Sequence, residues 1–223
     1  MPSLPDLVER FVLPSDDPGS LDAGVEGNSR LTGALGAVLF VGLFLEGCTL
    51  VLGVGDTLVA HVFVGFLIVP PILVKIGSTG YRMARYYLKD DRYRRKGPPH
   101  PVLRVLGPLV VLSTVALMAT GIALIAGGRG TGWNLGELHR DSFLVWIVLM
   151  TVHVLGHLVE TARLSAADWL PRRARVDRIG VRRGLVIGSL VVGLGLGALS
   201  IGWTHTFQSG RGAERHELRE DGH

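Results

Sequence analysis

Residues 138–161 read LHRDSFLVWIVLMTVHVLGHLVET, an apolar stretch with three histidines on or beside it. A membrane-spanning helix needs about 20 predominantly apolar residues, and this stretch meets that requirement. Steps of four and fourteen residues return a helix close to its starting face, so His139, His153 and His157 share one stripe. The same stripe carries Phe143, Trp146 and Met150. Ionisable side chains are costly inside a membrane and usually face the protein interior, so a functional hypothesis must explain this stripe.

The rest of the chain repeats this apolar character, and 48% of its 223 residues are hydrophobic. Long apolar stretches are typical of membrane-spanning helices. We therefore predict an all-α membrane protein with five transmembrane helices in one domain, residues 29–203. Polar segments flank this domain: residues 1–28, which lack the charge pattern of a secretory signal, and residues 204–223. The predicted spans lie near residues 31–52, 57–77, 104–126, 141–161 and 184–203.

The positive charge is concentrated in two loops, which predicts the orientation of the chain. Of the 23 lysines and arginines, nine lie between Lys75 and Arg104 and seven between Arg163 and Arg183. Both segments fall on the same side of the membrane, and basic loops mark the cytoplasmic side. We expect a multi-pass protein of the inner or plasma membrane, with the N-terminus inside and the C-terminal tail outside.

The same distribution argues against a nucleic-acid partner, although the net charge is +4 and the isoelectric point is 9.6. Basic loops beside membrane spans set topology and contact anionic lipid. The single cysteine, Cys48, excludes an internal disulfide and a cysteine-ligated iron–sulfur cluster. Glycine pairs four residues apart allow close helix packing and an oligomer, and they lie at Gly184 and Gly188 and at Gly193 and Gly197.

The second predicted span carries its own histidine, His61, in the half that we expect to lie outside. Gly65 lies one turn further inward on the same face and leaves room for a flat, bulky group beside the imidazole. Pro70 and Pro71 predict a kink near the middle of this helix.

Other polar positions have simpler interpretations. We interpret Glu46, near the outer end of the first span, as a carboxylate at the membrane interface rather than a buried functional acid. Residues 53–56, GVGD, predict a tight turn between the first two spans. The histidines of the C-terminal tail lack the spacing of a compact metal site, so we expect a flexible polar segment there.

The spacing of the histidines on the fourth span suits haem. Neutral imidazole is an axial ligand of haem iron. His139 and His153 stand fourteen residues apart, which is about 21 Å along a helix axis. That separation fits two haems stacked across a bilayer, each needing a second histidine from a facing helix.

This arrangement resembles the four-helix di-haem cytochrome b subunits of respiratory formate dehydrogenases, nickel–iron hydrogenases and small prokaryotic quinol-oxidising b cytochromes. The matching features are His61 with Gly65 on the second span, His139 and His153 on the fourth, and the basic continuation of the second span. The resemblance covers residues 30–162. It implies that the first four spans form a cytochrome b-like bundle with a cytoplasmic N-terminus. The stretches YRMARYY and RRKGPP are also similar to a group of actinobacterial membrane proteins, which indicates a divergent member.

Carried over to this chain, the resemblance implies that His61 and His139 bind the iron of an outer haem b. His153 would be one ligand of an inner haem, and Phe143 and Trp146 would line the pocket. The chain departs from the family pattern in its first span, which has no histidine, and in its added fifth span. We therefore expect one haem, while the second lacks a ligand.

The depth of the histidines gives a separate test of this pairing. With inner edges at Arg82 and Arg163, His61 lies level with about residue 142, which favours His139 as its partner. With the edge at Lys75 instead, His61 lies level with about residue 149, and His153 becomes a competitor. We prefer the pairing of His61 with His139, mainly on the resemblance.

Two functions from different classes remain open. The first is a b-type cytochrome that passes electrons between an extracytoplasmic redox protein, or oxidoreductase subunit, and the quinone pool. Any enzymatic activity would belong to a complex. The alternative is a haem-free membrane subunit or small transporter whose histidines pack or relay protons. His153 and His157, four residues apart, are a further alternative as ligands of a metal ion.

Overall fold

The structure is a computed structural model, and it describes residues 23–91, 93, 101–127, 134–167 and 179–220. Its side chains are described over the same ranges except at residues 23, 101–104, 157–167 and 210–220. Residues 1–22 of the predicted polar segment 1–28 lie outside the described residues.

The described chain is all helical and contains five helices long and apolar enough to cross a membrane, which confirms the predicted fold class. Each predicted span lies within one helix. A helix satisfies its backbone hydrogen bonds internally, which is what a segment in lipid requires. The helices are α2 (Ala23–Leu52), α3 (Val54–Tyr87), α5 (Pro101–Ile125), α6 (Leu135–Ala167) and α7 (Ile179–Glu220).

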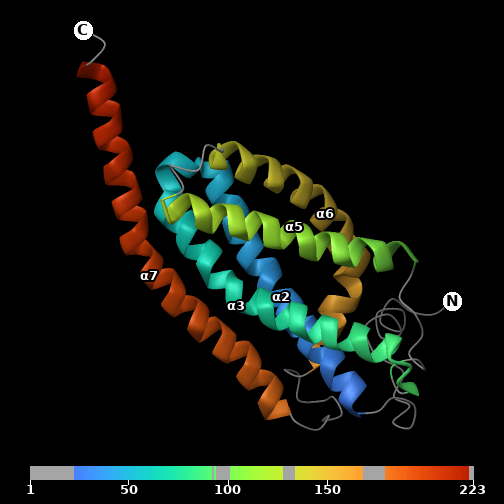
Figure 1. The fold of residues 1–223 in the computed structure, drawn as a ribbon. Helices are drawn as coiled ribbons and strands as arrows, with labels where there is room; N and C mark the ends of the chain where they lie inside the picture. Colours follow the sequence, from blue (N-terminus) through green and yellow to red (C-terminus); the bar gives the residue numbers. More distant parts are fainter. Residues whose placement is uncertain (1–22, 92, 94–100, 128–133, 168–178, 221–223) are drawn as a thin grey trace, which may run out of the picture.

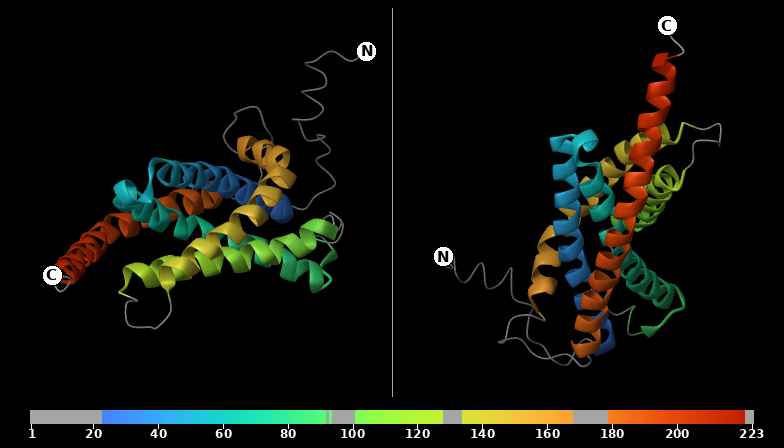
Figure 2. Two further views of the ribbon diagram at one scale, coloured as in Figure 1. Left: turned by 90° about the horizontal axis from the view of Figure 1, so that it is seen from above. Right: turned by 90° about the vertical axis from the view of Figure 1, so that its left-hand side faces the viewer.

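The first four helices form one group, and α7 is added on its outside (Figure 1). Helix α2 packs along both α3 and α6, and α5 packs along α6, whereas α3 and α5 touch at few points. Helix α7 runs along α3, its principal neighbour. The two further views in Figure 2 show the same pairing of α3 with α7. The helices α3 and α6 therefore face each other across the group rather than packing side by side.

Apolar side chains cover much of the outside of this group, as a lipid-facing surface requires. Only 6% of the most apolar 18-residue window of α6 is buried, against 28% for α7. Exposed residues on α6 include Leu144, Val148 and Leu155. The fold therefore contacts lipid most extensively along α6, the helix that carries the histidine stripe.

The junction of α2 and α3 is even shorter than the predicted four-residue turn. Gly53 alone separates the two helices, with a φ of 95° that side chains rarely adopt. Thr57 is the residue in α3 whose backbone leaves helical values, and its hydroxyl donates to the carbonyl oxygens of Thr49 and Gly53. The backbone stays helical at Pro70 and Pro71, both of them buried, and the residue with non-helical backbone angles inside α3 is Thr57.

Two helices extend beyond the predicted spans, and both for the same reason. Helix α2 begins at Ala23, inside the predicted polar segment 1–28, and α7 continues to Glu220, through most of the polar tail that we expected to be flexible. Figure 1 shows α7 projecting past the other helices toward the C-terminus. Hydropathy marks where the chain leaves the apolar layer, whereas a helix ends where its backbone hydrogen bonds end.

The N-terminal part of α2 and the C-terminal part of α3 are joined by a polar cluster of Asn28, Thr32, Lys75 and Ser78. The Ser78 hydroxyl lies 2.7 Å from both the Asn28 amide oxygen and the Thr32 hydroxyl. Lys75 donates to the Thr32 carbonyl oxygen at 2.9 Å, so its ammonium is bound to the neighbouring helix. This cluster supports the predicted continuation of α3, which ends at Tyr87.

Helix α7 uses one of its two glycine pairs against α3. A Cβ on Gly193 would collide with the Leu67 carbonyl oxygen, and one on Gly197 would lie 3.0 Å from the Phe63 ring. Around Gly184 and Gly188 nothing lies within 4 Å of such a Cβ. The Gly193 pair therefore allows the backbones of α7 and α3 to approach closely.

Gly193→Ala should lower the thermal unfolding midpoint of the detergent-solubilised protein, because the added methyl group forces α7 away from Leu67. Overpacking of this kind costs about 1–3 kcal/mol. Gly188→Ala is the matched control, and it should be neutral or stabilising because alanine is the better helix former. Equal midpoints for the two variants would contradict the close approach of α7 and α3.

Candidate functional site

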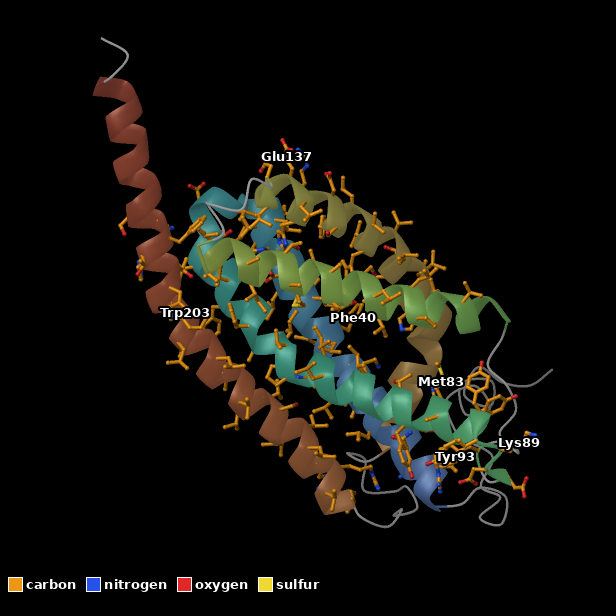
Figure 3. All side chains as sticks on the ribbon, viewed as in Figure 1. Phe40, Met83, Lys89, Tyr93, Glu137 and Trp203 are labelled. Carbon is orange, nitrogen blue, oxygen red and sulfur yellow. The ribbon has the colours of Figure 1, made fainter. Side chains whose placement is uncertain are left out.

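Two of the predicted site residues come together near the end of the group that holds the α2–α3 turn. The ring centroids of His61 on α3 and His139 on α6 are 6.5 Å apart, with the ring planes at 83°. His61 lies about two turns after the start of α3, and His139 lies one turn after the start of α6. Figure 3 labels Glu137, two residues before His139, at this end of the molecule.

Helix α2 provides two further polar side chains beside His61. Glu46 Oε1 lies 3.1 Å from His61 Nδ1, and the hydroxyl oxygen of Thr49 lies 2.9 Å from the same nitrogen. The side chains of His61 and Glu46 are 19% and 18% exposed. Glu46 is therefore a largely buried acid within the site and not the interfacial carboxylate that we had expected.

Glu46 also has an oxygen that the described residues leave without a partner. Its Oε2 is inaccessible to solvent and makes no hydrogen bond within the described part of the chain. An unpaired buried polar atom costs free energy, and such atoms mark functional sites or places where a proton or another group completes the bond. This end of the molecule therefore concentrates ionisable groups at a cost to stability.

Helix α5 provides the surroundings of His139. The Thr120 hydroxyl oxygen lies 3.0 Å from His139 Nδ1. A Cβ on Gly121 would lie 3.0 Å from Cε1 of the same ring. The sequence Thr120-Gly121 therefore offers His139 a hydrogen-bond partner and, directly beside it, the space for its imidazole.

The glycine predicted to leave room beside His61 faces α2. A Cβ on Gly65 would lie 3.6 Å from Glu46 Oε1, an ordinary contact distance. The neighbour of this glycine in the structure is thus the Glu46 carboxylate.

The aromatic residues of the stripe serve packing between α5 and α6. Trp146 is 6% exposed, and its indole nitrogen donates to the Thr114 hydroxyl oxygen at 2.9 Å. The Phe143 ring lies 6.2 Å from the Trp146 ring, with the planes tilted by 30°. Trp146 is thereby fixed to α5, and the pair lies along the stripe inward of His139.

The remaining histidines of the stripe lie away from His61. His153 is about 21 Å from His139 along α6, and its side chain is half-buried. The side chain of His157 lies outside the described residues. Within the described part of the chain, no group of three or more metal-binding side chains is present. The structure therefore brings His61 together with His139 and leaves His153 apart from both.

No family model, curated protein or solved structure matches the chain. The chemistry of the site must therefore be argued from its own residues.

The Trp146–Thr114 contact predicts a measurable coupling between α5 and α6. Trp146→Phe and Thr114→Val should each destabilise the protein, and together they should cost less than the sum. The coupling free energy of such a hydrogen bond is about 0.5–1.5 kcal/mol. Unfolding of the single and double variants in detergent gives this value. Trp203→Phe, at a residue 54% exposed, is the control, and strict additivity at 146 and 114 would disprove the contact.

Proposed function

We propose that this chain is a membrane b-type cytochrome in which His61 and His139 bind the iron of one haem. The observation that supports this proposal is the separation of the two rings. Two imidazoles on opposite sides of one metal ion, each bound at about 2 Å, have ring centroids about 6 Å apart. His61 and His139 have ring centroids 6.5 Å apart. Such a site needs two protein ligands only, because the porphyrin supplies the other four.

The position of the pair on the fold also supports haem binding. The two histidines belong to α3 and α6, helices that face each other without packing side by side, so a flat group between them would not break a helix contact. The surroundings are apolar helices in lipid, and burial of this kind is one means by which proteins set the potential of haem. When bound, the haem would supply one-electron redox chemistry, while the residues of the chain hold and orient it.

The function that follows is electron transfer between a redox protein outside the membrane and the quinone pool. A haem held near one end of the helices lies close to one membrane surface and within reach of a docked partner. In this proposal the inner or plasma membrane is the location, the N-terminus is inside, and lipid surrounds the helices. Oligomers could form through the glycine pair at Gly184 and Gly188, which α3 leaves free. A quinone site and a second haem at His153 are not part of this proposal.

One contact favours the haem-free candidate, a membrane subunit or small transporter that relays protons. Glu46 and His61 are 3.1 Å apart, and one carboxylate oxygen is unpaired among the described residues. A buried acid beside an imidazole inside a membrane is a common arrangement for proton transfer.

A reduced-minus-oxidised spectrum of the protein from haem-replete cells separates the two candidates. We expect sharp b-type bands, and we expect His61→Ala and His139→Ala each to abolish them, because one imidazole cannot complete the axial coordination. His205→Ala, at an exposed position on α7, is the control and should keep the bands. Wild-type protein without bands would refute the cytochrome. Bands that survive His139→Ala but not His153→Ala would refute the pairing.

A further inference from the structure

His61 and His139 share a second feature besides their proximity. In each ring it is Nδ1 that contacts a neighbouring helix, and that helix has no histidine of its own. Nδ1 of His61 faces Thr49 and Glu46 of α2, and Nδ1 of His139 faces Thr120 of α5. Neither threonine was predicted as the partner of a histidine, since hydroxyl groups are common in membrane helices and usually bond to their own backbone.

The direction of the hydrogen bond at His61 follows from the hydroxyl group of Thr49. A threonine hydroxyl has one hydrogen, and that of Thr49 is directed to the Glu46 carbonyl oxygen at 2.6 Å. Its oxygen can therefore only accept from the ring. Nδ1 of His61 must then carry the proton, with Glu46 Oε1 as a second acceptor at 3.1 Å.

The same reasoning holds at His139. The Thr120 hydroxyl donates to backbone carbonyl oxygens of its own helix, at 2.9 Å to Ala116 and 3.0 Å to Leu117. Its oxygen is left to accept from Nδ1 of His139. Nδ1 of His139 therefore carries the proton as well.

We infer that Thr49 and Thr120 are positioning residues, each accepting the Nδ1 proton of its histidine and leaving Nε2 unprotonated for a metal. A histidine that binds a metal through one nitrogen usually donates the other N–H to an oxygen acceptor, which fixes the tautomer and the ring orientation. Here α2 and α5 supply those acceptors, and α3 and α6 supply the ligands. The purpose of this arrangement rests on the haem proposal, whereas the tautomers themselves do not depend on haem.

The tautomers can be measured without haem. In full-length protein from haem-deficient cells, ¹⁵N spectra of labelled histidine should show both His61 and His139 protonated at Nδ1, with assignment by His61→Gln and His139→Gln. A proton on Nε2 of either ring would overturn the inference. Nδ1 protons in a protein that never takes up haem would support the assigned tautomers and refute the cytochrome.

The haem-loaded protein gives the second measurement. Thr120→Val and Thr49→Val should each release haem about 10-fold faster to a haem acceptor, at the lower end of the effects seen for such partners. Adding Glu46→Leu to Thr49→Val removes both side-chain acceptors of His61 and should increase the effect toward about 100-fold. Serine at 49 or 120 keeps the hydroxyl and should restore slow release.

Thr151→Val is the matched control. Thr151 lies on α6, is exposed, and donates to the carbonyl oxygen of Ile147 in its own helix. Its replacement should leave haem release unchanged. If Thr49→Val and Thr120→Val release haem at the same rate as Thr151→Val, the positioning role is overturned. This holds even if the wild-type spectrum shows a b-type cytochrome.

Discussion

The absence of water around the middle of these helices is the constraint on which the rest of the structure depends. Each polar group there must find its partner within the protein, because none is available from lipid. The threonines meet this demand through their own helices, and Trp146 meets it through Thr114. The exception among the described residues of the site is Glu46, whose Oε2 has no partner. The end of the helix group that holds the α2–α3 junction is therefore where the fold leaves a buried polar atom without a hydrogen bond among the described residues.

The membrane fold could be predicted because each span is identified by its own stretch of sequence alone. A run of apolar residues long enough to cross the hydrocarbon layer identifies a helix without knowledge of its neighbours. The ends at Ala23 and Glu220 could not be predicted in the same way, since they lie in polar sequence beyond the layer. The break at Thr57 and the intact helix at Pro70 depend on local hydrogen bonds that hydropathy does not describe.

The candidate site could be predicted only in part, for a related reason. His61 and His139 were paired from their depth and from the family resemblance, and the structure places them beside each other. The positions of Glu46 and Thr120 depend on how α2 and α5 are rotated about their axes. Both helices are apolar nearly all round, so no amphipathic stripe identifies the inward face. A prediction made one span at a time therefore identifies the rare histidines, but it does not show which residues of the other helices contact them.

The missing histidine of the first span acquires a physical interpretation from these contacts. In the di-haem family that the chain resembles, that span supplies a ligand, whereas here α2 supplies Glu46 and Thr49 at Nδ1 of His61. A helix that orients a ligand on the neighbouring helix can do so without contributing one itself. His153 lies about 21 Å away from His139 along α6. A single haem at His61 and His139 would then confine electron transfer to one half of the membrane. The redox partner and the quinone would both have to reach the haem from that half.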